Sequence, residues 1–199
     1  MGEEECVDYE EIIKESLDVN NSIGLDFSLE HLFVTSEGEH IDAPSYYEAS
    51  LTKLPKEQRK LSHMVKDSKN YLKQKQKIDN LHIHIANQRK DFLHKVSRNI
   101  ANKYDYVFVE DLDLKEMSSS KTKYKFGLRI FDLGYSAFLN YLSYKLDWFN
   151  KKIIKVNRYF PSSKRCNECY YKNEELTLSQ RSWVCPICGK KHDRDINAA

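Results

Sequence analysis

Four of the five cysteines lie near the end of the chain, in two Cys-x-x-Cys pairs. Cys166 and Cys169 form the first pair, fifteen residues follow, and Cys185 and Cys188 form the second. This spacing is typical of a zinc ribbon, in which four thiolates complete a tetrahedral Zn²⁺ site and leave no position for water. We therefore predict a structural zinc ion. A redox role for the pairs lacks the expected sequence context, and we expect His192 to neighbour the site without binding the metal.

Three acids form the second candidate group. Asp26 lies inside an apolar run, where a carboxylate needs a partner, and Glu110 closes the apolar run that begins at Tyr106. The third acid is Asp193 or Asp195, close to the end of the chain. Three converging carboxylates repel one another unless cations lie between them, and their hard oxygen atoms suit Mg²⁺ or Mn²⁺. Each acid taken alone is explained well by a helix cap or a surface charge.

The first half of the chain predicts three strands, a long helix and a fourth strand. Short apolar runs near residues 23–27, 32–34 and 40–41 are typical of strands in a meander. An apolar stripe at helical spacing over residues 68–103 predicts an amphipathic helix. The nearly continuous apolar run that ends at Glu110 predicts a central strand with both faces covered.

The second half adds a helix and a strand to this order. We expect a helix from about Ile130 to Phe149 and a last strand in KKIIKVNRYF, after a Ser- and Lys-rich loop from Met117 to Lys125. The alternation argues for an α/β fold with a mixed sheet and flanking helices. Because ligand sites of open α/β sheets gather at the carboxyl ends of adjacent strands, we expect Asp26 and Glu110 to lie close together.

Charge is distributed unevenly along the chain. The first 20 residues hold eight acids and one lysine, so the remainder carries a formal net charge of +9 although the whole chain carries +2. This balance suits a polyanionic partner, although solvated Lys-rich helices explain it more simply. No apolar run approaches the length of a membrane span, and the acidic N-terminus does not resemble a signal peptide. We expect a soluble cytoplasmic protein that binds no membrane.

Several segments together resemble the RuvC-like nuclease domain of the TnpB (OrfB) family, the transposon-encoded RNA-guided endonucleases related to the type V CRISPR effectors. The segments are GLDFS around Asp26, FVEDLDL around Glu110, YFPSSKRCNECYYK and WVCPICGKKHDRDINAA. The stretch HIANQRKDFLHKVSRNIANKYDYVFVEDL is also similar to that family, so the likeness covers about residues 20–199.

This resemblance implies an RNase H-like (RuvC) fold with an inserted zinc ribbon. It assigns Asp26 and Glu110 to the family's first two catalytic acids, and Asp195 to the third through the pattern Asp195-Ile196-Asn197. The trio would hold two Mg²⁺ or Mn²⁺ ions for phosphodiester cleavage. Asp193 then becomes an outer neighbour or a helix start.

The resemblance also suggests how the chain is divided. We expect an acidic leader or linker over residues 1–19, a RuvC-like core over 20–160, a zinc ribbon over 161–190 and the start of the last catalytic helix over 191–199. The ribbon would lie along the nucleic acid. Phosphate contacts are expected from Lys164, Arg165, Lys190 and Lys191, while Tyr170, Tyr171 and Trp183 would stack on bases or cover the ribbon.

Two functions of different class follow. Full-length relatives carry an N-terminal lobe that binds the guide RNA. Here only an acid-rich stretch of about twenty residues precedes the first strand, so we expect a catalytic fragment. The first function is a Mg²⁺-dependent DNA endonuclease of the transposon-associated, RNA-guided kind, acting in a prokaryotic cytoplasm, with guide RNA as a partner of the full-length family. The alternative is a non-catalytic nucleic-acid-binding ribbon module or a degenerate transposase remnant.

Overall fold

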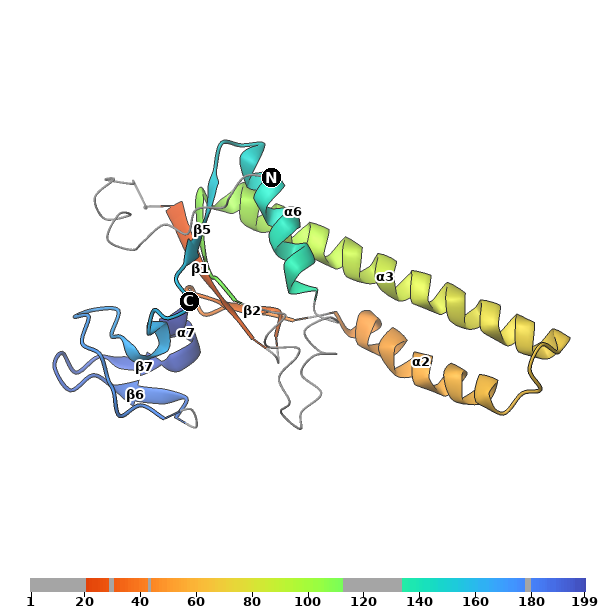
Figure 1. The fold of residues 1–199 in the computed structure, drawn as a ribbon. Coiled ribbons are helices and arrows are strands. Elements are labelled where there is room, and N and C mark those ends of the chain that lie inside the picture. The colour runs from red at the N-terminus through yellow and green to blue at the C-terminus, as the bar shows by residue number, and fades with distance from the viewer. Residues whose placement is uncertain (1–20, 29–30, 43, 113–133, 178–179) are drawn as a thin grey trace.

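The computed structural model describes residues 21–28, 31–42, 44–112, 134–177 and 180–199. Within them a five-stranded sheet carries two helices on one face and a small cysteine-bearing unit on the other, while a helical hairpin extends away from the sheet (Figure 1). No helix in these segments has both the length and the apolar character that crossing a membrane requires. The predicted loop from Met117 to Lys125 lies outside the described residues.

The sheet combines an antiparallel meander with two parallel strands. Its strand order is β3-β2-β1-β4-β5. The strands are β1 (Ser22–Phe27), β2 (Phe33–Thr35), β3 (His40–Ile41), β4 (Tyr106–Glu110) and β5 (Lys152–Val156). The first three are antiparallel to one another, whereas β4 runs parallel to both β1 and β5. The predicted meander and the interior position of β4 are confirmed. The expectation that both faces of β4 are covered is wrong, because burial alternates along the strand and only Val107 and Val109 are fully buried.

Two helices cover the sheet and form the core with it. Helix α3 (Lys69–Lys103) begins after Ser68, whose side chain accepts a hydrogen bond from the Tyr71 amide, and it confirms the predicted long helix. Helix α6 (Tyr135–Asp147) is shorter than predicted at its C-terminal end, because Trp148 and Phe149 lie in an exposed turn. Buried side chains of both helices, Leu93, Ile100, Phe138, Leu142 and Leu146, form one core with Val107 and Val109 of β4.

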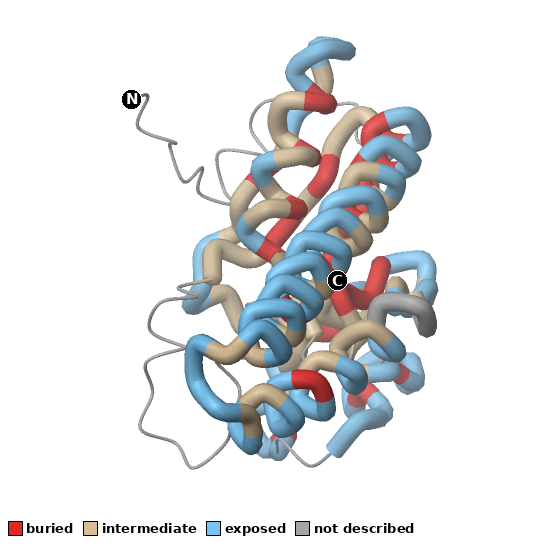
Figure 2. The backbone as a smooth tube through the Cα atoms, turned by 90° about the vertical axis from the view of Figure 1, so that its right-hand side faces the viewer, coloured by how far each residue is buried: buried red, intermediate tan, exposed pale blue. Residues whose placement is uncertain are grey.

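Helix α2 (Ser45–Ser62) was not predicted. It packs antiparallel to the first half of α3, and the two form the projecting hairpin. Glu57 is buried between the helices, where it accepts hydrogen bonds from Lys60 at 2.9 Å and from the Gln74 amide at 2.8 Å and pairs with Lys77 at 2.9 Å. Buried segments gather near the sheet, while much of the hairpin is exposed (Figure 2).

A second small sheet carries the end of the chain. Strands β6 (Ser182–Val184) and β7 (Lys191–Asp193) are antiparallel, and the short helix α7 (Arg194–Ala198) follows directly. Trp183 is buried against the ring of His192, with 4.7 Å between the ring centroids. A 3₁₀ turn, η2 (Ser162–Lys164), connects this unit to β5 and contacts α7.

Candidate functional site

Asp26 and Glu110 lie at the edge of the sheet where two parallel strands end. Leu25 of β1 is paired with Val109 of β4, so the next residue along each strand is one of the two acids. The carboxyl ends of adjacent parallel strands are a common place for ligand sites. The strand register therefore places Asp26 and Glu110 side by side.

Asp195 approaches this edge from α7. The Asp193 carboxylate caps that helix by accepting hydrogen bonds from the amides of Asp195, at 3.0 Å, and Ile196, at 3.2 Å. Helix α7 packs directly on β1: a Cβ atom added at Gly24 would lie 1.3 Å from the Ala199 carbonyl oxygen. Only glycine at this position allows so close an approach, which brings the helix of Asp195 to the strand of Asp26.

The pKa of the Asp26 carboxyl is affected by both of the other acids. Burial raises the pKa of its carboxyl, the negative charges of Glu110 and Asp195 raise it further, and the pKa reaches about 7 instead of 3.8. The positive charge of Arg194 acts in the opposite direction. Burial and the neighbouring negative charges both disfavour the ionised form of Asp26, and a cation bound between these acids would favour it.

Two of the acids have partners of their own. The Arg181 guanidinium donates to Asp195 Oδ2 at 3.0 Å, and the Ser162 hydroxyl donates to Glu110 Oε1 at 2.7 Å. The three carboxylates are not gathered as closely as the four cysteine sulfurs, which are the only group of possible metal ligands within 4.8 Å of one another among the described residues.

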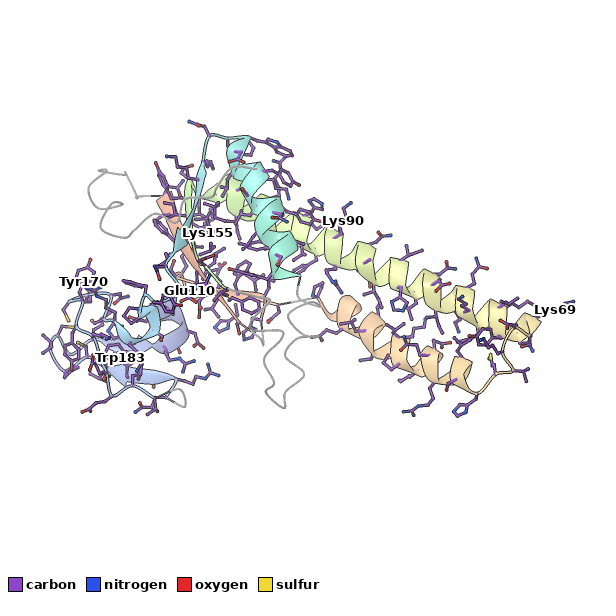
Figure 3. All side chains as sticks on the ribbon, in the orientation of Figure 1. Lys69, Lys90, Glu110, Lys155, Tyr170 and Trp183 are labelled. Atoms are coloured by element: carbon purple, nitrogen blue, oxygen red, sulfur yellow. The ribbon has the colours of Figure 1, made fainter. Side chains whose placement is uncertain are left out.

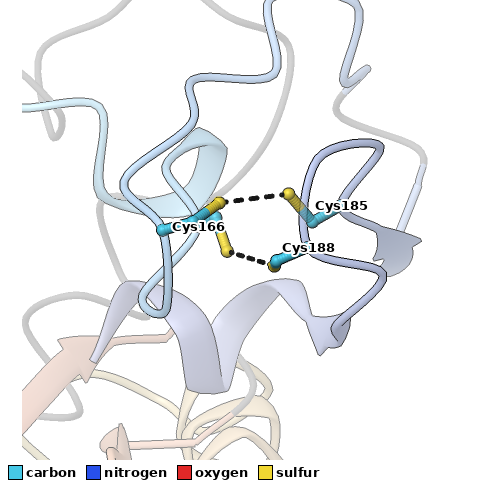
Figure 4. A group of neighbouring side chains, drawn as sticks. Cys166, Cys185 and Cys188 are labelled. Carbon is cyan, nitrogen blue, oxygen red and sulfur yellow. Dashed lines mark hydrogen bonds between the residues drawn. The ribbon is translucent and has the colours of Figure 1, made fainter.

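The four cysteines form a compact tetrad of sulfurs (Figure 4). The Sγ atoms of Cys166 and Cys188 are 3.6 Å apart, and those of Cys169 and Cys185 are 3.5 Å apart. Zn–S bonds of about 2.3 Å in a tetrahedron would place sulfurs about 3.8 Å apart. The donor atoms and their spacing therefore fit a zinc ion.

Local backbone geometry explains why each pair can bind a metal. The Tyr170 amide donates to the Cys166 carbonyl at 2.9 Å, and the Gly189 amide donates to the Cys185 carbonyl at the same distance. Both donors have left-handed φ angles, 61° at Tyr170 and 73° at Gly189. Each Cys-x-x-Cys pair thus forms a tight turn that points its two sulfurs to one side.

The residues around the tetrad have varied exposure. His192 Nε2 lies 3.1 Å from the Cys166 sulfur, as expected of a neighbour that hydrogen-bonds to a thiolate. Trp183 covers the interior of the ribbon, whereas Tyr170 is 58 % exposed (Figure 3).

A cleft of about 390 Å³ separates the ribbon from the sheet edge, and its lining includes Glu110 and Arg165.

Several neighbours of the acids could not be recognised from the sequence. Ser162 and Arg181 contact Glu110 and Asp195 only through the folded chain. Tyr135 is buried, and its hydroxyl finds no hydrogen-bond partner among the described residues, although the charges of Glu110 and Asp26 act on it. Ser162 belongs to the segment YFPSSKRCNECYYK, but nothing in that segment indicates a contact with Glu110, because such roles depend on contacts across long sequence separations.

A family model matches the first part of the chain. OrfB_IS605, described as "Probable transposase", matches residues 5–121, and a second model, the TNB domain of Cas12f1-like proteins, matches residues 135–199. The first match spans more than half of the chain. The resemblance deduced from the sequence motifs is thereby confirmed.

Curated relatives extend this likeness. A "Putative RNA-guided DNA endonuclease" of Streptomyces pristinaespiralis is 34 % identical over 178 residues, covering 89 % of this chain and 43 % of the relative. "Putative RNA-guided DNA endonuclease InsQ" of Escherichia coli (strain K12) is 33 % identical over 189 residues. This match covers 89 % of this chain and 47 % of the relative. The chain thus spans less than half the length of these two relatives.

A solved structure matches the architecture. The protein in "Cryo-EM structure of the Cas12f1-sgRNA-target DNA complex" superposes with a TM-score of 0.62 at 21 % identity, over 93 % of this chain and 50 % of that one. At this identity the similarity concerns the fold. The predicted α/β fold, with a mixed sheet, flanking helices and an inserted ribbon, is confirmed.

Proposed function

We propose that this chain, which belongs to the OrfB_IS605 family of probable transposases, is the nuclease portion of an RNA-guided DNA endonuclease and hydrolyses phosphodiester bonds in DNA. The observation that carries this proposal is the crowding of Asp26 by Glu110 and Asp195 at the carboxyl edge of two parallel strands. The names of the curated relatives support the reaction class.

Asp26, Glu110 and Asp195 would hold Mg²⁺ or Mn²⁺ in this proposal. Two such ions would activate a water and stabilise the leaving 3′ oxygen. The protein's part is to fix the three carboxylates: β1 and β4 hold two of them in register, and the Asp193 cap and Gly24 position α7 for the third. Ionised Asp26 is required for binding, since a protonated carboxyl is a poor metal ligand.

The cysteine tetrad would hold zinc with a structural role. Cys166, Cys169, Cys185 and Cys188 supply four thiolates, which complete a tetrahedral site and leave no coordination position for substrate. Zinc would therefore stabilise the ribbon over residues 161–190, between the core over 20–160 and the catalytic helix that starts within 191–199. We assign residues 1–19 to a leader or linker.

The proposed partners are DNA and a guide RNA. The similar Cas12f1 protein is described in complex with both sgRNA and target DNA. In this chain, residues 51–90, here called the basic hairpin, hold eleven bases and three acids. Lys69 and Lys90 mark two places on its long helix in Figure 3. Such a concentration of positive charge attracts phosphate backbones. The proposed place of action is the cytoplasm of a prokaryotic cell, where the protein would associate with nucleic acid.

A second candidate function is binding of nucleic acid without cleavage. It is favoured by the Arg181–Asp195 ion pair, in which the guanidinium of Arg181 contacts a carboxylate oxygen that would otherwise bind the metal. The two functions are separated by following binding and cleavage on the same labelled DNA at several salt concentrations, with Mg²⁺ or EDTA. Salt-dependent binding with metal-dependent cutting supports the nuclease, whereas the same binding without cutting supports the binding module.

A further inference from the structure

We propose that Ser162 is a positioning residue for Glu110, and that Asn197 ties Ser162 to the helix of Asp195, so that the cysteine site and the carboxylate site share one support. This inference rests on the proposed nuclease function and adds residues to it. The support is the linking segment (residues 162–166), which begins at Ser162 and ends at the buried Cys166.

The contact between Ser162 and Glu110 has a defined direction. Ser162 Oγ lies 2.7 Å from Glu110 Oε1, and an ionised carboxylate can only accept, so the hydroxyl donates. A hydrogen bond to a charged acceptor is stronger than one between neutral groups, and it fixes the rotation of the carboxylate. One oxygen of Glu110 is thereby held, and the orientation of the other follows.

Asn197 holds the linking segment from the other side. Its Nδ2 donates to the Ser162 carbonyl at 3.0 Å and to the Arg165 carbonyl at 2.7 Å. Its Oδ1 is buried and accepts no hydrogen bond from the described residues, so the side chain acts there through its amide nitrogen. A leucine at this position could donate neither hydrogen bond and would add no charge.

These contacts join three proposed metal ligands through a short path. Asn197 lies two residues beyond Asp195 on α7, Ser162 contacts Glu110, and Arg165 directly precedes Cys166. Helix α7 has only five residues, too few for independent stability, so its position depends on such tertiary contacts. Order at the zinc site and order at the carboxylates are therefore coupled through residues 162–166.

Manganese affinity of the zinc-loaded chain tests Ser162 without requiring cleavage. Ser162→Ala should bind Mn²⁺ about ten- to a hundredfold more weakly than the wild type in an electron paramagnetic resonance titration, the usual effect of losing a group that orients a ligand. Ser162→Thr keeps the hydroxyl and should restore most of the affinity. Ser163→Ala alters the neighbouring serine of the same 3₁₀ turn, whose hydroxyl makes no hydrogen bond to the three acids within the described segments, and should bind as the wild type does.

Asn197→Leu provides a second test with little change in side-chain volume and no added charge beside the metal site. It should also weaken Mn²⁺ binding about tenfold or more, with zinc content retained. Equal Mn²⁺ affinity in the wild type, Ser162→Ala and Asn197→Leu would overturn the inference while leaving the metal site intact. Failure of the wild type itself to bind Mn²⁺ would instead overturn the proposed carboxylate site on which the inference rests.

Discussion

The carboxylate of Asp193 accepts a hydrogen bond from the backbone amide of Asp195, and this contact gives the two neighbouring acids different roles. Asp193 caps α7, while the Asp195 side chain is directed to Arg181 and adds to the charge around Asp26. Two acids separated by one residue can therefore be tested against each other.

Asp193→Ala should lower stability, whereas Asp195→Asn should abolish cleavage. Loss of the cap is expected to cost about 1 kcal/mol of unfolding free energy. Asp193→Asn keeps a side chain that can cap the helix and should retain cleavage. Denaturant unfolding and DNA cleavage of the three variants separate the roles. Full activity in Asp195→Asn together with none in Asp193→Asn would reverse the assignment.

The raised pKa of Asp26 predicts a stability that depends on pH in the metal-free protein. Between about pH 4 and pH 7 the unfolded chain ionises this group while the folded chain keeps it protonated, so stability falls as pH rises. Relative to Asp26→Asn, the wild type should lose roughly 3 to 4 kcal/mol across this window and no more above it. Urea unfolding at several pH values, in the presence of EDTA, measures the difference. Parallel curves for the two proteins would contradict the raised pKa of Asp26.

Zinc removal should loosen the ribbon and weaken the carboxylate site together. Cys185→Ser removes one buried ligand, so zinc content should fall and hydrogen exchange over residues 161–199 should accelerate. Mn²⁺ binding should weaken in the same variant because residues 162–166 connect the two sites. Cys6→Ser, at the cysteine outside the tetrad, is the matched control. Retention of one zinc ion per chain in Cys185→Ser would contradict the assigned tetrad.

Neutralising the basic hairpin should weaken nucleic-acid binding evenly across sequences. Lys69, Lys73 and Lys75 are exposed on the outer part of α3, and their combined replacement by glutamine removes three charges without touching the core. The slope of log K against log salt should become shallower by about 0.9 for every phosphate that the protein no longer neutralises. Gln76→Ala, on the same part of the helix, should leave the slope unchanged. An unaltered slope in the triple variant would exclude this surface from the interface.

Strong periodicity made much of the core predictable. The apolar runs of β1 and β4 and the helical stripe of α3 are local patterns, and burial of those patterns against one another forms the sheet and its cover. Asp26 and Glu110 could be placed at one edge because both belong to apolar runs that were predicted to be neighbouring strands. The spacing of the cysteines was by itself sufficient to indicate a metal site.

The remainder depended on contacts that no local pattern encodes. Helix α2 contains Pro55, which ordinarily disfavours a helix interior, and its packing involves Glu57 contacts with Gln74 and Lys77 of α3. Ser162 and Asn197 are separated by 35 residues, and their contact depends on the packing of α7 against the 3₁₀ turn η2. Such long-range hydrogen bonds are determined by the assembled fold.

The central claim is that Asp26, Glu110 and Asp195 form one metal-dependent cleavage site. The most direct measurement is cleavage of labelled single-stranded and double-stranded DNA by the zinc-loaded chain, with Mg²⁺ or Mn²⁺ against EDTA, beside Asp26→Ala and Glu110→Ala. We expect cutting that requires the divalent ion and disappears in both variants, while DNA binding is retained. Cutting by Asp26→Ala at the wild-type rate, or no cutting by a folded, zinc-loaded wild type that binds DNA, would contradict the claim.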